Sequence, residues 1–151
     1  MEHTQEGRLL TKIILDTFKL NGVLVLEGDK LVKSLELTSA RWKILGALAY
    51  GSNPMTVPDI ARVMGQSRQA VQRISNEMVK DGLLTTLANP EHKRAKLVKL
   101  TDKGAQAYSQ AMEKQIPCVN GLASDIKQTE LEIAASVLKN LIAQLDKNQI
   151  G

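Results

Sequence analysis

A chain of 151 residues with 43% hydrophobic and 24% charged side chains has the composition of a folded protein, and it is long enough to bury a core without disulfides. This composition excludes a disordered chain. No uninterrupted apolar run approaches the ~18 residues of a membrane-spanning helix, and the N-terminus lacks the pattern of a signal peptide. We therefore expect a cytoplasmic protein with no membrane partner. One cysteine and two histidines predict neither an internal disulfide nor a metal site, and no cofactor is expected.

The net charge of +4 is concentrated in one part of the chain. Residues 67–100 carry seven basic and three acidic side chains, whereas the remainder carries thirteen of each. A local positive field is typical of a surface that binds a polyanion. The ordinary alternative is a solvated charged surface.

The first predicted element is a long helix. Apolar residues recur at helical spacing from about Arg8 to Leu26. The polar run at residues 27–29 predicts its end, and residues 31–37 then form a connector or a single turn. A second helix is predicted from Thr38, whose hydroxyl caps it, to Tyr50.

Two further helices follow in close succession. Thr56 caps a short helix that stops at Gly65, and Ser67 caps a longer one that ends before Gly82. Only Gly65 and Gln66 separate the two. Such a short connection makes consecutive helices cross steeply, which predicts a helix-turn-helix.

After the fourth helix the sequence changes to the pattern of strands. Residues 83–87 and 97–100 predict two short strands, and residues 89–92 (Asn-Pro-Glu-His) predict a turn between them. The result is a β-hairpin with a basic tip.

The remaining residues predict two terminal helices. Thr101 caps a fifth helix that runs to about Ile116, where Pro117 predicts an interruption. Thr129 and Glu132 form a predicted capping box for a last helix, which ends near Gln149.

Together these elements predict a mainly α fold with a small β-hairpin wing. We expect residues 1–36 to form an N-terminal dimerisation helix and connector. Residues 37–104 form a winged helix-turn-helix, and residues 105–151 form C-terminal dimerisation helices. The first and last helices have apolar stripes but little within the chain to cover them, so a second copy of the chain is the simplest partner.

The fourth predicted helix divides into two chemically opposed faces. Its apolar face consists of Ala70, Val71, Ile74, Met78 and Val79. The opposite face carries side chains that can make paired hydrogen bonds to base edges in a major groove, namely Arg68, Gln69, Gln72, Arg73 and Asn76. An ordinary surface helix is the alternative, but the tight turn before this helix and the basic hairpin after it favour double-stranded DNA as the partner.

The hairpin tip carries four candidate DNA contacts. They are His92, Lys93, Arg94 and Lys96. Long cationic side chains can reach phosphates or enter a narrow minor groove, whereas the alternative is a solvated tip whose lysines deter strand-edge aggregation. The capping residues Thr38 and Thr56 are further candidates for contacts with the DNA backbone.

The run from Leu37 to Gly104 resembles the MarR family of bacterial winged-helix regulators. The resemblance rests on the start LT, the segment SRQAVQRISNEMVKDGLL and the wing signature NPEHKRAKLVKLTDKG. It implies a homodimer whose terminal helices intertwine and whose two winged helices each read half of a pseudo-palindrome.

Carried over by position, the recognition-helix contacts are Ser67, Arg68, Gln69, Gln72 and Arg73. Arg94 corresponds to the wing arginine that enters the minor groove. The family usually has an aspartate that restrains this arginine where this chain has His92. His92 either contacts phosphate as a cation or has no such role, and the rigidity of the wing is left open.

Many members of the family release DNA on binding a small aromatic or phenolic acid. The candidate effector residues of this chain are Phe18, Arg41, Trp42 and Tyr50, although the core explains Trp42 better.

No nucleophile with a base, carboxylate pair or phosphate-binding loop is recognisable, so we expect no enzyme and no catalytic residues. We expect a transcriptional regulator that represses by covering a promoter. One alternative is a winged-helix module that binds protein, which predicts an acidic or apolar face on the fourth helix. Another is a DNA-binding regulator that responds to oxidation of Cys118, although we expect this thiol to be inert.

Overall fold

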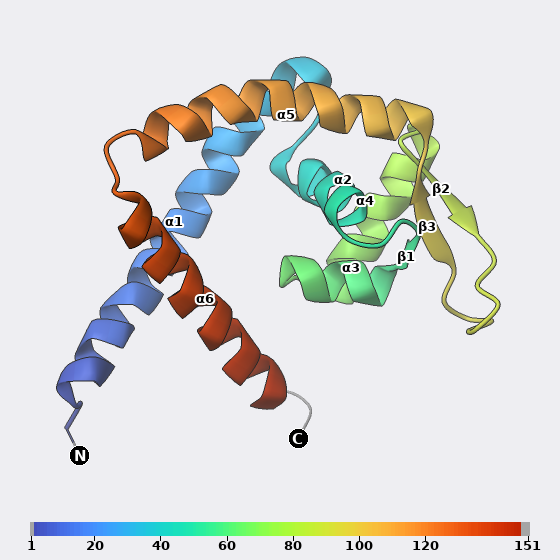
Figure 1. The fold of residues 1–151 in the computed structure, drawn as a ribbon. Helices are drawn as coiled ribbons and strands as arrows, with labels where there is room; N and C mark the ends of the chain where they lie inside the picture. The colour runs from blue at the N-terminus through green and yellow to red at the C-terminus, as the bar shows by residue number, and fades with distance from the viewer. Residues whose placement is uncertain (1, 149–151) are drawn as a thin grey trace. The chain divides into compact units, whose positions relative to one another are not determined.

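The computed structural model describes residues 2–148 and divides after Lys114 into two compact units. The described chain is mostly helical and contains one small antiparallel sheet, which confirms the predicted fold class (Figure 1). The elements are, in chain order, α1 (Gln5–Val32), the short 3-10 helix η1 (Lys33–Leu35), α2 (Ser39–Tyr50), β1 (Met55–Thr56), α3 (Val57–Met64), α4 (Arg68–Lys80), β2 (Leu84–Leu87), β3 (Leu97–Leu100), α5 (Asp102–Ala123) and α6 (Gln128–Asn148). No helix within residues 2–148 has the length and apolar character needed to cross a membrane.

α1 is one uninterrupted helix, so the predicted break at residues 27–29 is wrong. Gly28 is buried where α1 passes the start of α2, and a Cβ atom there would collide with the Ser39 hydroxyl. The backbone N–H of Ser39 donates to Asp29 Oδ1 at 2.6 Å, and the Ser39 hydroxyl donates to the Val25 carbonyl at 2.7 Å. Gly28 and Asp29 therefore connect α1 to α2 instead of ending α1.

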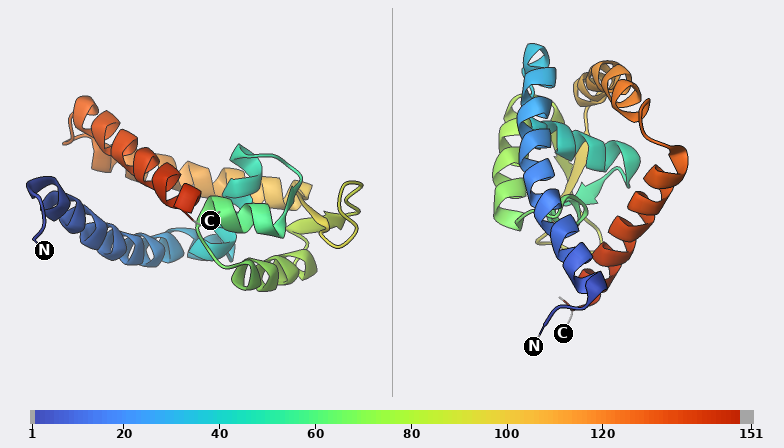
Figure 2. Two further views of the ribbon diagram at one scale, coloured as in Figure 1. Left: turned by 90° about the horizontal axis from the view of Figure 1, so that it is seen from below. Right: turned by 90° about the vertical axis from the view of Figure 1, so that its left-hand side faces the viewer.

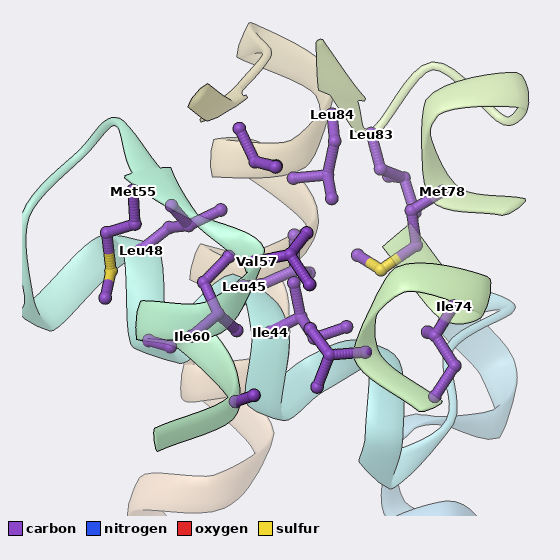
Figure 3. Packing of buried hydrophobic residues seen from close by; sticks show 14 of the residues in the cluster. Ile44, Leu45, Leu48, Met55, Val57, Ile60, Ile74, Met78, Leu83 and Leu84 are labelled. Atoms are coloured by element: carbon purple, nitrogen blue, oxygen red, sulfur yellow. The ribbon is translucent and has the colours of Figure 1, made fainter. Parts of the chain in front are cut away.

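The hydrophobic core lies between α2, α3, α4 and the sheet (Figure 3). Its largest fully buried apolar side chains are Ile44, Leu45, Leu48, Ile60, Met78, Val32 and Val71. α2 contributes three of these and packs against both α3 and α4. The core therefore covers the inner faces of α3 and α4 and leaves the outer face of α4 exposed.

The predicted caps of the helix-turn-helix are confirmed. Thr56 Oγ1 accepts from the N–H of Asp59 at 3.2 Å, and Ser67 Oγ accepts from the N–H of Ala70 at 3.1 Å. Gly65 ends α3 with φ of 63°, a left-handed conformation that glycine adopts without a steric penalty. The two helices are thus separated by a tight turn whose geometry is set locally.

The sheet has three strands in the order β1-β3-β2, one more than the sequence predicts. β2 and β3 form the predicted hairpin, with Thr86 opposite Val98, and β1 pairs Met55 with the same Val98. β1 has only two residues, too few to display an alternating pattern. Its pairing with β3 attaches the base of the wing to the start of α3.

α5 runs through Pro117, so the predicted interruption is wrong. Proline removes one helical hydrogen bond, to the carbonyl of Glu113. Both residues are exposed, so this turn of the helix lies at the surface, where water can replace the missing donor. The predicted cap at Thr101 is confirmed, because its hydroxyl accepts from the N–H of Gly104 at 3.0 Å.

The second unit contains the end of α5 and α6, and its described helical residues bury no apolar side chain completely. α6 begins one residue before Thr129, so the predicted capping box at Thr129 is wrong. The backbone N–H of Lys127 instead donates to Glu130 Oε2 at 3.2 Å. The predicted end near Gln149 lies outside the described residues.

Candidate nucleic-acid interface

The predicted recognition residues lie together on the outer face of α4. Ser67, Arg68, Gln69, Gln72, Arg73 and Asn76 are all exposed. Val71, Ile74 and Met78 are buried on the inner face, as the helical period predicts. Ser75 is buried with them, which the apolar pattern did not indicate.

A groove of about 1030 Å³ lies between this face of α4 and the wing. We call it the basic groove. Its charged and amide-bearing lining residues are Arg68, Arg73, Lys80, Arg94, Lys96, Gln69, Gln72 and Asn76, and no acidic residue lines it. Five cations without an acid attract a polyanion, and the three amides offer both donors and acceptors.

Lys80 is a member of the groove that the sequence prediction missed. It follows Arg73 by seven residues, so the helical period places both on one face of α4. That spacing was a signal available in the sequence.

Two contacts organise the polar face of α4. Gln72 Nε2 donates to Asn76 Oδ1 at 2.9 Å, so the two amides form a pair. Arg73 Nη1 donates to Glu77 Oε1 at 3.3 Å, and this arginine is therefore partly neutralised in the free protein. Glu77 is the only acidic residue within α4.

The wing tip is shaped by its backbone. The N–H of His92 donates to the Asn89 carbonyl at 3.3 Å, and the N–H of Ala95 donates to the His92 carbonyl, also at 3.3 Å. Two consecutive turns thus hold the segment that presents Arg94. All four predicted wing residues are exposed, but only Arg94 and Lys96 line the basic groove.

The hydroxyls of Thr38 and Thr56 are both engaged as helix caps. Thr38 Oγ1 accepts from the N–H of Arg41 at 3.2 Å, and Thr56 Oγ1 also donates to Asp59 Oδ2 at 2.8 Å. Thr38 can therefore still donate its hydroxyl proton to a phosphate, whereas Thr56 can do so only by giving up its bond to Asp59.

The four candidate effector residues lie in different environments. Phe18 is exposed on α1, whereas Trp42 is half-buried against the core. Arg41 forms ion pairs with α4, and the ring of Tyr50 meets Tyr108 edge-on with ring centroids 6.0 Å apart. Burial, and then the nearby Tyr50 hydroxyl, raise the pKa of Tyr108 above its ordinary value.

The tight turn between α3 and α4, the acid-free groove and the hairpin beside it define a winged helix-turn-helix protein that binds DNA. A sequence model described as MarR family matches residues 35–95. The chain is also 31% identical over 136 residues to the uncharacterized protein Rv2011c of Mycobacterium tuberculosis, covering 90% of this chain and 94% of that protein. The chain belongs to the MarR family of transcription regulators, which are not enzymes.

Solved structures agree with this assignment at the level of the fold. A MarR/EmrR family transcriptional regulator from Acinetobacter sp. ADP1 superimposes with a TM-score of 0.80 at 20% identity, over 91% of this chain and 96% of that one. CouR from Rhodococcus jostii RHA1, solved with bound p-coumaroyl-CoA, has a TM-score of 0.76 at 16% identity, over 86% of this chain and 91% of CouR.

Proposed function

We propose that this DNA-binding transcription regulator acts as a homodimeric repressor on a pseudo-palindromic operator. The observation that carries the proposal is the basic groove, in which α4 and the wing present cations and amides without an acid. A protein-binding winged helix would instead present an acidic or apolar face here. Bound across a promoter, such a dimer would exclude the polymerase.

Within this proposal the residues of α4 and of the wing have two roles. Gln69 and Gln72, with Arg68 and Arg73 beside them, read base edges and nearby phosphates in the major groove, because they stand near the N-terminus of α4. Ser67 and Asn76 flank them. Arg94 enters the minor groove from the wing, while Lys96 contacts phosphate along with His92 and Lys93 at the tip.

The support for a homodimer is the exposed apolar surface of the terminal helices. In the first unit, α1 extends away from the wing, and its start and the hairpin tip lie at opposite ends of that unit (Figure 2). Its exposed apolar residues include Leu9, Ile13, Leu20, Val23 and Leu24, and those of α6 include Leu131, Leu138, Ile142 and Leu145. Surface of this extent on a monomer marks an interface.

The last part of the proposal is that a small-molecule effector controls DNA binding. CouR was solved with a phenolic acyl thioester, p-coumaroyl-CoA. We expect an aromatic or phenolic compound to bind near Trp42 and Arg41, with Phe18 or Tyr50 of either protomer contributing a ring, and to lower the affinity for DNA.

The decisive experiment is fluorescence anisotropy with palindromic duplexes from the region upstream of the protein's own gene, and with pooled random duplexes. Affinity should fall by roughly 10³- to 10⁵-fold between 50 and 200 mM salt if six to ten phosphates are neutralised. Binding to neither DNA, or binding that ignores salt, would refute the proposal.

Two substitutions separate the proposed roles. Arg94→Ala should weaken binding to every duplex, whereas Gln72→Ala should change the sequence preference and leave affinity for random DNA nearly intact. Equal losses on all sequences from both variants would contradict this division.

A further inference from the structure

Arg41 connects α2 to the C-terminal half of the recognition helix. Its Nη1 lies 2.7 Å from Asp81 Oδ2, and its Nη2 lies 3.7 Å from Glu77 Oε2. The Arg41 side chain is only 20% exposed, whereas both carboxylates are about half exposed. One guanidinium of α2 therefore lies between two acids, Glu77 in the last turn of α4 and Asp81 directly after its end.

Glu77 is shared between this arginine and the basic groove. Its Oε2 faces Arg41, while its Oε1 accepts from Arg73 Nη1 at 3.3 Å. Arg73 lines the groove, but Glu77 does not. The only acid of α4 is thus divided between Arg73, its nearer partner, and Arg41 on α2.

We propose that Arg41 is a positioning residue for DNA binding, which competes with Arg73 for the Glu77 carboxylate and so limits the neutralisation of Arg73 to a single bond through Oε1. This inference rests on the proposed role of the groove and extends it to a residue that does not touch DNA. Without Arg41, Glu77 would have Arg73 as its one remaining recorded partner. It would then neutralise Arg73 more fully and repel the phosphates that approach it.

The chemistry of arginine suits this role. Its planar fork donates from Nη1 to Asp81 while Nη2 lies near Glu77, an arrangement that the point charge of a lysine does not reproduce in the same geometry. Arg41 also lies beside Asp81 at the C-terminal end of α4, where the helix dipole favours a cation.

The test is a double-mutant cycle measured by DNA anisotropy over a range of salt concentrations. Arg41→Met and Arg41→Lys are made in the parent protein and in Glu77→Gln. In the parent, each should weaken binding by about three- to five-fold at low salt, the scale of a partly exposed ion pair. Loss of one effective phosphate contact should also reduce the slope of log K against log salt by about one.

In the Glu77→Gln background both Arg41 variants should bind as tightly as Glu77→Gln itself, because the carboxylate that pairs with Arg73 is no longer present. Lys43→Met is the matched control, since Lys43 is also a cation of α2 but makes no recorded ion pair within residues 2–148. Thermal unfolding shows whether each variant is folded. If Arg41→Met does not fold, Arg41→Lys still tests the inference.

Two results would overturn the inference. One is a loss of equal size in the Glu77→Gln background, which would mean that Arg41 contacts DNA or acts only through packing. The other is a loss no greater than that of Lys43→Met. Absence of DNA binding by the parent itself would instead refute the proposed function, so the two failures are distinguishable.

Discussion

Ser75 is buried in the core with its hydroxyl unpaired. It is 2% exposed on the core side of α4, and its hydroxyl has no hydrogen-bond partner among the described residues. Ser75→Ala removes a buried, unpaired hydroxyl and introduces a better helix former, so we expect it to stabilise the protein by about 1 kcal/mol. Denaturant unfolding should show a higher midpoint with an unchanged slope, and DNA affinity should not change. A lower midpoint would mean that the hydroxyl has a partner in solution.

Tyr108 makes the stability depend on alkaline pH. Its pKa is raised in the folded state, chiefly by burial, whereas in the unfolded chain a tyrosine ionises near its ordinary pKa of about 10. The unfolded state therefore loses its proton first as the pH rises, and the stabilisation present below that pKa declines above it. Tyr108→Phe should lack this part of the decline. Urea unfolding of both proteins from pH 8 to 11 measures the difference, and parallel curves would contradict the assignment.

At the scale of elements, the start of α5 depends on one glycine. Gly104 is buried, and a Cβ atom there would overlap the carbonyl of Leu83, which is backbone and cannot rotate away. Gly104→Ala should therefore destabilise the protein by about 1–3 kcal/mol. Gly46→Ala is the control, because its Cβ would meet the Tyr108 ring at an ordinary 3.6 Å. We expect that variant to be at least as stable as the parent, since alanine favours the helix.

The elements that could be predicted from sequence are those whose signals are local. Thr38, Thr56 and Ser67 cap their helices because a hydroxyl reaches an N–H only three residues away. Two of the errors came from features that depend on distant residues. In the sequence alone Gly28 suggests a helix end, and only its packing against Ser39 explains a glycine within α1. β1 is a strand only because β3 pairs with it.

The same distinction applies to the candidate site. The helical period alone assigns Gln72 and Arg73 to the outer face of α4. By contrast, the pairing of Arg41 with Asp81 joins residues forty positions apart, and no pattern in the sequence indicates it. The arrangement of the wing beside α4, which creates the basic groove, is likewise a property of the fold.

At the scale of the whole molecule, the proposed dimer predicts a concentration-dependent mass. Leu20 and Leu24 are each more than half exposed and lie four residues apart on one face of α1. Replacing both by aspartate should leave each protomer folded but shift the dissociation constant of the dimer upward by at least tenfold, since two buried charges would lack partners. Sedimentation equilibrium measures this shift.

Val63→Asp is the control for that experiment. Val63 is 65% exposed, but it lies on α3, outside the terminal helices. Its replacement should leave the dimer intact. If the double variant dimerised like the parent, this face of α1 would not belong to the interface.

Because Gly28 packs closely against Ser39, α1 is fixed to α2 near one end, and a small rotation there displaces its other end. The helix has 28 residues and is therefore about 42 Å long, and two hydrogen bonds from Ser39 fasten its base to α2. A rotation of about 5° at that base moves the far end, about 35 Å away, by about 3 Å, close to the ~3.4 Å step between base pairs. In the proposed dimer, the stiffness of this one joint would determine how much variation in operator spacing the two winged helices tolerate.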